Sequence, residues 1–340
     1  MNKYKGLVLF AVFLVILTLA LTRFLNTQPQ PHNRELVPIS LALDWTPNTN
    51  HTGIYVALSK KWYEEEGVEL SLLPYGSVSP DVLVYADSAD LGISSAESVT
   101  ASAAVGAPVV SIAAILAHNT SALAVRKDSG ITHPSELDGK IYGGYGASFE
   151  EPVIRTIIQN DGGKGEFKNV TLNVDAPEAL MSKRVDFAWI FLGWQGIQAK
   201  REGLPLTTFA IGDYGIPDYY TPVLITSRAT LENKKDTLKK FMRATARGYE
   251  YARTHPKESA EILINEAQQG TFPDPGLVFE SQEYLSPRYA NSRKQWGIQE
   301  KSAWQNYPSF MIENGSIFDA SGKPISELDF DALYTNELFN

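Results

Sequence analysis

The sequence contains no cysteine among its 340 residues. A chain without thiols forms no disulfide bond, holds no metal through thiolate ligands and carries no lipid on a cysteine side chain. Histidine is scarce as well, with five residues, and no pair of them has the spacing typical of metal ligands. The sequence therefore predicts no metal site and no other cofactor.

Basic residues are too few for a nucleic-acid-binding surface, because 30 Lys and Arg stand against 39 Asp and Glu for a net charge of −9. Catalytic fingerprints are also missing. Ser148 has no Gly-x-Ser-x-Gly elbow around it, and the glycine-rich turn 143–146 lacks the Lys-Ser/Thr ending of a Walker loop and the spacing of a dinucleotide fingerprint. These absences favour a binding protein over an enzyme.

The N-terminal residues differ in composition from the rest of the chain. Lys3 and Lys5 precede an apolar run of 17 residues, 6–22, which ends at Arg23. This pattern predicts a secretory signal peptide or an N-terminal membrane anchor over residues 1–28, followed by a polar linker over 29–35. No clear Ala-x-Ala cleavage site follows the run, so both readings stay open. We expect an extracytoplasmic protein, in the periplasm or at the outer face of the cell membrane.

Short apolar segments alternate with amphipathic ones along most of the chain. A strand at 39–43, a helix at 52–66 closed by Gly67 and a strand at 68–73 form a predicted parallel βαβ unit. The alternation continues to residue 225, and the chain is then mainly helical. We predict an α/β protein with two lobes, each a doubly wound sheet with flanking helices, made of residues 36–120 with 223–340 and of residues 121–222. A ligand of such a fold binds between the lobes.

The segment 44–53, Asp-Trp-Thr-Pro-Asn-Thr-Asn-His-Thr-Gly, lies between a predicted strand and a predicted helix. Trp45 offers a flat face there, and Asn48 and His51 offer hydrogen-bond donors and acceptors. Free backbone N–H groups at a helix start also face a ligand in many proteins. The alternative is a helix N-cap with a packed tryptophan, and the residue types alone favour neither.

Further candidates have equally ordinary alternatives. Glu97 and Glu150 begin predicted helices, where acids are also simple partners of the helix dipole. Gly144 and Gly146 belong to a turn that suits an anion or the polar edge of a ligand but is also a plain tight turn. The strand aromatics and a crossing aromatic suit either stacking or the core: Trp189, Trp194 and Tyr219.

Several segments together resemble the thiamine-pyrimidine-binding family. They are 44–53, 55–57, 62–68, 142–146, 186–194, 218–222, 241–246 and 284–287, within a resemblance that covers nearly all of residues 38–310. This family includes periplasmic proteins that serve ABC importers of formylaminopyrimidine or hydroxymethylpyrimidine, and fungal pyrimidine-phosphate synthases on the same fold.

The resemblance implies a monomeric two-lobed, periplasmic-binding-protein-like fold of type II, which binds a small pyrimidine for an ABC permease and its ATPase. It implies stacking faces from Trp45, Trp189 and Trp194, with Tyr219 as a further aromatic candidate. Polar contacts would come from the remaining candidates: Asn48, His51, Glu97, Glu150, Gly144 and Gly146. Many relatives carry Tyr in place of Leu192 and Glu in place of Gln195, so the exact pyrimidine stays open.

Three alternatives follow from the same resemblance. The synthases need iron and a cysteine-rich motif, whereas this chain has Asp-Tyr-Tyr-Thr-Pro at 218–222 and no cysteine. Binding proteins for other solutes, such as sulfonates, share the fold, so the fold alone does not identify the ligand. A sensor ectodomain would need a signalling partner on a separate chain.

Overall fold

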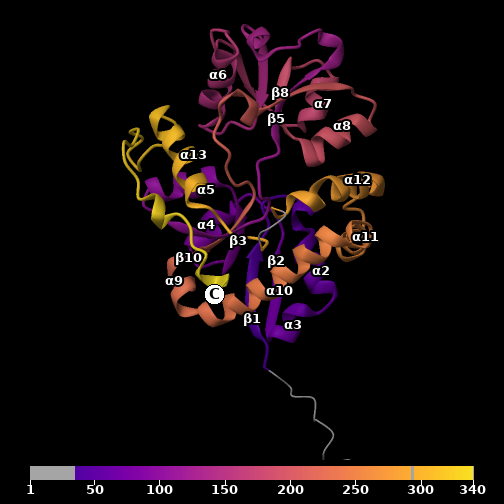
Figure 1. Ribbon diagram of the computed structural model, residues 1–340, viewed down its shortest axis with the longest axis vertical. Coiled ribbons are helices and arrows are strands. Elements are labelled where there is room, and N and C mark those ends of the chain that lie inside the picture. The colour runs from indigo at the N-terminus through magenta and orange to yellow at the C-terminus, as the bar shows by residue number, and fades with distance from the viewer. Residues whose placement is uncertain (1–34, 292–294, 340) are drawn as a thin grey trace, which may run out of the picture. The chain divides into compact units, whose positions relative to one another are not determined.

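Two five-stranded sheets form the framework of the computed structural model, which describes residues 35–291 and 295–339 (Figure 1). Residues 37–340 belong to one compact unit, and residues 1–36 are a separate unit. The predicted targeting segment 1–28 lies outside the described residues, as does all of the predicted linker except residue 35. Among the helices that the structure describes, none is both long enough and apolar enough to span a bilayer.

The first sheet has the strand order β2-β1-β3-β10-β4. Strands β1, β2 and β3 run parallel, whereas β10 runs antiparallel to both β3 and β4. β10 therefore enters the sheet at the edge where the three parallel strands end. The strands are β1 (Val37–Ala42), β2 (Val68–Leu73), β3 (Leu91–Ser94), β4 (Val109–Ala114) and β10 (Val223–Ser227).

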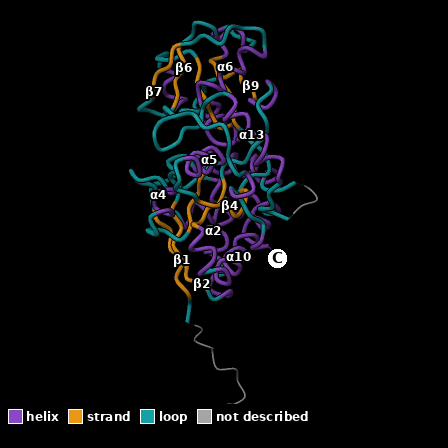
Figure 2. Tube along the Cα trace, turned by 90° about the vertical axis from the view of Figure 1, so that its left-hand side faces the viewer, coloured by secondary structure: helices purple, strands orange, loops and turns teal. Residues whose placement is uncertain are grey.

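The second sheet repeats this plan with the order β7-β6-β8-β5-β9. Strands β6, β7 and β8 run parallel, and β5 runs antiparallel to β8 and pairs with β9 on its other side. Both views show the strands of the two sheets toward opposite ends of the described unit (Figures 1 and 2). The strands are β5 (Ser121–Arg126), β6 (Ile141–Gly144), β7 (Lys168–Thr171), β8 (Phe187–Phe191) and β9 (Leu206–Ala210).

Helices cover both faces of each sheet, because alternate strand residues point to opposite faces. In β5, Leu123 and Val125 pack in the same core cluster as α6 residues, while Ala124 packs with the helices on the other face. In β1, Leu41 packs with α2 and α10, while Ala42 packs on the opposite side. The helices around the second sheet are α6 (Glu150–Asn160), α7 (Ala176–Met181) and α8 (Ile197–Arg201).

Most of the helical mass after β10 packs around the first sheet, as expected for the helical last third of the chain. Helices α2, α3 and α10 lie on one side, and α4 and α5 contact the other. The helices are α2 (Thr52–Ser59), α3 (Trp62–Glu66), α4 (Pro80–Tyr85), α5 (Ala96–Ala104), α9 (Arg228–Asn233), α10 (Lys235–Thr254), α11 (Pro256–Glu266), α12 (Pro275–Leu285) and α13 (Lys301–Glu313).

The prediction of a single helix at 52–66 is wrong, because this segment forms two separate helices, α2 and α3. Lys61 between them has a left-handed backbone with φ of 58°, which breaks the helical path. Gly67 ends α3 in the left-handed conformation, with φ of 82°, as expected. The strand expected at 39–43 is β1, which begins two residues earlier and ends one residue earlier in the chain.

Two glycines set the contact between α2 and α10. A Cβ atom on Gly248 would overlap the carbonyl oxygen of Gly53, and a Cβ on Gly53 would overlap the ring of Tyr249. The two helices therefore pack backbone against backbone at this point. Tyr249 also donates a hydrogen bond of 2.6 Å from its hydroxyl to the Asn50 carbonyl, next to the segment that leads into the cavity described below.

We expect Gly248→Ala to destabilise the protein by about 1 to 3 kcal/mol, because the added methyl group forces α2 and α10 apart. Helix propensity alone predicts the opposite sign, a gain of about 1 kcal/mol. Urea unfolding followed by circular dichroism measures the difference. Gly212→Ala is the matched control, because its Cβ would meet open space. A Gly248→Ala variant as stable as its parent would contradict the packing argument.

Candidate functional site

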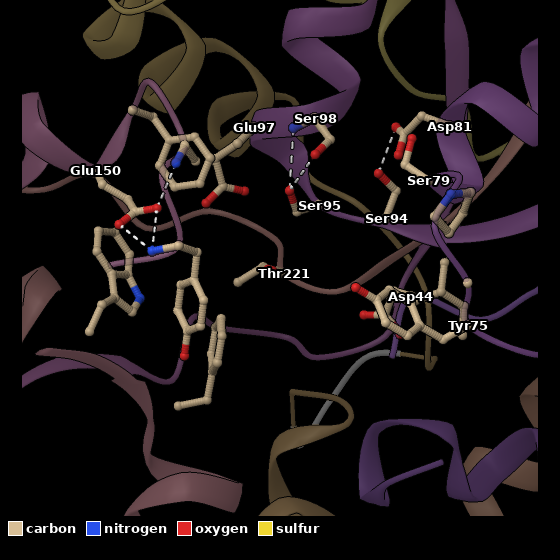
Figure 3. Close-up of a pocket in the computed structure, with 18 of the residues that line it drawn as sticks. Asp44, Tyr75, Ser79, Asp81, Ser94, Ser95, Glu97, Ser98, Glu150 and Thr221 are labelled. Carbon is tan, nitrogen blue, oxygen red and sulfur yellow. Dashed lines mark hydrogen bonds between the residues drawn. The ribbon is translucent and has the colours of Figure 1, made fainter. Parts of the chain in front are cut away.

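A cavity of about 400 Å³ lies where the carboxyl ends of the parallel strands of both sheets face each other (Figure 3). The first sheet contributes loops and helix starts that follow β1, β2 and β3, together with Thr221 just before β10. The second contributes the end of β8 and the turn between β6 and α6. The lining residues are Asp44, Tyr75, Gly76, Ser77, Ser79, Pro80, Asp81, Ile93, Ser94, Ser95, Glu97, Ser98, Tyr145, Ala147, Phe149, Glu150, Trp189, Phe191 and Thr221.

Aromatic rings form much of the wall. Trp189, predicted as a stacking face, is 4% exposed and meets the Phe149 ring edge-on at 6.1 Å. Three further lining rings are more open, with Tyr75 and Tyr145 each 46% exposed and Phe191 37% exposed. Flat aromatic surfaces left open in a cavity suit a flat ligand ring, because stacking buries both partners.

Four carboxylates also line the cavity: Asp44, Asp81, Glu97 and Glu150. The described lining residues include no Lys, Arg or His, so no cationic side chain in the lining balances these acids. Glu97 and Glu150 were predicted as ligand contacts from the sequence, whereas Asp44 and Asp81 were not. The cavity therefore offers hydrogen-bond acceptors and negative charge.

Glu97 is the most deeply buried of the free acceptors. It begins α5, is 4% exposed, and its Oε2 has no hydrogen-bond partner among the described residues. Burial raises the pKa of Glu97 to about 7, against smaller lowering effects of the Tyr219 hydroxyl and of Ser95. A buried acceptor with a free oxygen beside a cavity is suited to a ligand N–H group.

Glu150 has a different environment, although it too was predicted as a ligand contact. Its carboxylate accepts hydrogen bonds from the Tyr142 hydroxyl at 2.7 Å and from the backbone N–H groups of Tyr145 and Ala147 at 2.8 to 3.1 Å. These bonds fix the glycine-rich turn. A Cβ on Gly144 would overlap the Glu150 carboxylate, so glycine is required there by packing. Glu150 thus holds the turn that presents Tyr145.

Gln195 holds Tyr145 from the other side. Its Nε2 donates to the Tyr145 hydroxyl and to Asp175 Oδ1, both at 2.8 Å, while its Oε1 accepts from the Phe191 backbone at 3.0 Å. A glutamate carboxylate at this position would have no N–H to donate to Asp175. The amide therefore suits this chain's own contacts, and two lining rings depend on it.

Asn48 and His51 lie behind the cavity and not in its lining. Asn48 caps the short helix η1 (Thr49–His51) and its side chain accepts from the Asn50 backbone, which is the N-cap alternative considered above. His51 is fully buried, with Nδ1 accepting from the Asn48 backbone N–H and Nε2 at 2.9 Å from Asp44 Oδ1. The ring is therefore the neutral tautomer that donates to Asp44, and it positions a lining carboxylate.

The other predicted residues lie near the cavity without lining it. Trp45 is 51% exposed and its ring lies 4.8 Å from that of the lining residue Tyr75. Trp194 packs toward Phe272, with ring centroids 6.3 Å apart. Tyr219 is buried beside Glu97 and stacks on Tyr307 at 3.7 Å, and Gly146 turns with a φ of 85° near Thr171. Contact of these residues with a ligand stays a prediction.

Several lining residues that were not predicted lie at positions where the sequence favours a ligand contact. Asp44 lies two residues beyond β1, Ser94 ends β3 and Ser95 follows it, so the rule that ligands bind at the carboxyl ends of parallel strands points to them. Tyr75 lies two residues beyond β2. Asp81 could not be found in this way, because it lies in the first turn of α4, a helix that was not predicted from the sequence.

Comparisons with known proteins agree with this architecture. The family described as NMT1/THI5 like matches residues 48–259. The formylaminopyrimidine-binding protein of Halalkalibacterium halodurans is 26% identical over 311 residues, which cover 89% of this chain and 93% of that protein. The 4-amino-5-hydroxymethyl-2-methylpyrimidine phosphate synthase of Legionella pneumophila is 27% identical over 236 residues, covering 68% and 74% of the two chains.

The crystal structure of the periplasmic aliphatic sulphonate binding protein SsuA from Escherichia coli superposes with a TM-score of 0.66 at 14% identity. The match covers 89% of this chain and 99% of that one. At this identity the likeness concerns the fold alone. Together with the two mixed sheets and their flanking helices, it confirms the predicted two-lobed, periplasmic-binding-protein-like fold.

We expect Glu97→Gln to stabilise the unliganded protein at pH 8, by up to about 3 kcal/mol, and to change its stability little at pH 5. The folded-state pKa of about 7 lies above the ordinary value of 4.5. As pH rises from 4.5 to 7, the unfolded chain releases the Glu97 proton while the folded chain retains it, so parent stability from this group falls. Above pH 7 the loss is complete.

Urea unfolding of parent and variant at the two pH values checks this expectation. Glu178→Gln, which removes an exposed acid from the start of α7, measures the general effect of one lost negative charge. A Glu97→Gln effect that is equal at pH 5 and pH 8 would show that burial does not perturb this carboxyl.

Proposed function

Because the chain belongs to the NMT1/THI5-like family, we propose that it is a solute-binding protein for a thiamine-precursor pyrimidine, formylaminopyrimidine or hydroxymethylpyrimidine. The observation that carries this proposal is the combination of open aromatic rings and buried carboxylate acceptors in one cavity. The name of the Halalkalibacterium halodurans relative supports the same ligand class.

The chemistry of an aminopyrimidine fits such a cavity. Its ring is flat and apolar on both faces, so it stacks on aromatic side chains such as Phe191 and Tyr145. Its edge carries an amino group next to a ring nitrogen, and a carboxyl group pairs with both in one plane. Glu97, with a free Oε2 and a pKa raised to about 7, is suited to that pairing because a shared proton satisfies the ring nitrogen.

A sulfonate ligand fits less well, although a sulfonate-binding protein shares the fold. A sulfonate is an anion, and anion sites in proteins use Arg, Lys or free backbone N–H groups. Here the lining carries four carboxylates, and the Tyr145 and Ala147 backbone N–H groups already donate to Glu150. The serine hydroxyls of the lining donate hydrogen bonds but carry no positive charge, so an added anion would still be repelled by these carboxylates.

A synthase activity is the second candidate, because the Legionella pneumophila relative carries that name. The family's synthases need iron and a cysteine-rich motif, and this chain contains no cysteine. The groups in the cavity are acceptors and rings, which bind and orient a pyrimidine. We therefore propose binding without chemistry.

We further propose that the protein delivers its ligand to an ABC permease with an ATPase partner, for thiamine salvage. Residues 1–28 would direct export or anchor the chain at the outer face of the membrane, which places the monomeric protein outside the cytoplasm. We assign residues 36–120 with 223–340 to one lobe and residues 121–222 to the other.

Calorimetric titration of the full-length chain tests the ligand class. We expect formylaminopyrimidine or hydroxymethylpyrimidine to bind, and ethanesulfonate not to bind. Phe191→Ala should weaken pyrimidine binding about tenfold, because a lost stacking ring costs about 1 kcal/mol in addition to its buried area, and 1.4 kcal/mol is about tenfold in affinity.

Tyr85→Ala is the matched control, because Tyr85 is also an exposed ring but does not line the cavity. It should leave affinity unchanged. Sulfonate binding without pyrimidine binding would overturn the ligand class, and equal effects of the two variants would place the ligand elsewhere.

A further inference from the structure

We propose that the cavity selects a positively charged ligand, namely an aminopyrimidine that carries an ammonium group on a short arm beside its ring. This inference rests on the proposed binding of an aminopyrimidine in this cavity, and it replaces the neutral arm of formylaminopyrimidine or hydroxymethylpyrimidine with a cationic one. It follows from acidic side chains that the described lining leaves without a cationic partner, at one side of an aromatic cavity.

The first step concerns Asp44 and Asp81, which follow β1 and β2 of the first sheet and line the same cavity. Each accepts a single hydrogen bond from another side chain: Asp81 from the Ser94 hydroxyl at 2.7 Å, and Asp44 from the neutral His51 ring at 2.9 Å. Neither partner carries a positive charge. Burial raises the pKa of Asp81, and the nearby Asp44 charge raises it further, so the two carboxylates repel each other.

The second step concerns Glu97, which Figure 3 shows between Asp81 on one side and Glu150 on the other. It is more than nine-tenths buried and its Oε2 has no partner among the described residues. An acid at a helix start ordinarily serves the helix dipole while exposed to water. The Tyr219 hydroxyl is close enough to lower the pKa of Glu97 but completes no hydrogen bond with Oε2. A buried acceptor left in this state is costly, so the position of Glu97 is better explained by a donor that a ligand supplies.

The third step is the match with an ammonium group, which has three N–H donors and needs several acceptors around it. Ser79, Ser94 and Asp81 gather at one side of the cavity, with Asp44 nearby, and all belong to the first sheet or the segments after its strands (Figure 3).

The rings of Tyr145, Phe149, Trp189 and Phe191 belong to the second sheet and its turn. A ring held by the aromatic side would extend a short arm into the acidic corner.

A cation placed there offsets the repulsion between Asp44 and Asp81. In a partly desolvated site, an ammonium group gains more from these charges than a hydroxyl of the same size does, because a hydroxyl carries no net charge. The cavity should therefore separate two ligands that differ only in this group.

Two isosteric probes test the inference on the unaltered, full-length chain at pH 7.5. They are 4-amino-5-aminomethyl-2-methylpyrimidine, whose arm ends in an ammonium group, and 4-amino-5-hydroxymethyl-2-methylpyrimidine, whose arm ends in a neutral hydroxyl. We expect the aminomethyl probe to bind at least tenfold more tightly by calorimetry.

Asp81→Asn keeps the shape of the corner and removes one charge. It should reduce the preference for the aminomethyl probe to about threefold or less, while the affinity for the hydroxymethyl probe changes less than threefold. Asp44→Asn is the second variant, for use where melting curves show that the first is not folded. Asp87→Asn is the control, because Asp87 is exposed near the same helix, has a left-handed φ of 54° that Asn tolerates, and does not line the cavity.

The outcomes separate the two proposals. If the hydroxymethyl probe binds as tightly as the aminomethyl probe or more tightly, charge selection is overturned while pyrimidine binding stands. If neither probe binds, charge selection is overturned, and titration with formylaminopyrimidine decides separately whether the proposed function stands. If the preference persists in both Asp44→Asn and Asp81→Asn, the acidic corner does not cause it and the assignment is wrong.

Discussion

The direction of two strands, β5 and β10, determines where the cavity of this protein forms. β5 and β10 each run antiparallel to the parallel strands beside them, and each is the first strand the chain forms after it passes from one sheet to the other. Both therefore begin at the edge where the parallel strands end. The crossings and the loops after β1, β2, β3 and β6 consequently meet in one place, and loops are where side chains are free to serve a ligand.

Some polar side chains in and around the cavity are hydrogen-bonded within the protein, and others keep an acceptor without a described partner. Glu150 and Gln195 form their hydrogen bonds with the glycine-rich turn and with Tyr145 and Phe191, so they fix these lining rings before a ligand binds. His51 does the same for Asp44. Glu97 is the contrast, since its buried Oε2 has no described partner. A fixed frame with a few open acceptors lets a ligand bind without first ordering the site, which lowers the entropic cost of binding.

Strand positions could be predicted from the sequence because short apolar segments between turn residues are local signals, and β2 agrees with its expected bounds of 68–73. The break between α2 and α3 could not, because Lys61 has no propensity for its left-handed backbone and tertiary packing imposes it. At the site, Glu97 and Trp189 line the cavity. Residue types alone left each of them an ordinary alternative, a partner of the helix dipole for Glu97 and a core aromatic for Trp189. Asp81 was missed because its role depends on closeness to Asp44 across 37 residues of chain, which residue types do not encode.

A ligand in this cavity also affects how the two sheets are held together. Away from the cavity, Arg201 of α8 pairs with both Asp274 and Glu280 next to and within α12, and Ser281 donates to the Gly193 carbonyl. These contacts join elements that belong to different sheets. A ligand that touches Glu97 on one side and Trp189 on the other adds a second connection, and any arrangement that keeps both contacts gains the ligand's binding free energy. A ligand with no differential contact across the two sheets would leave that arrangement unchanged. Glu97 belongs to a helix that follows a strand of the first sheet and Trp189 to a strand of the second, so a ligand that contacts both meets this condition.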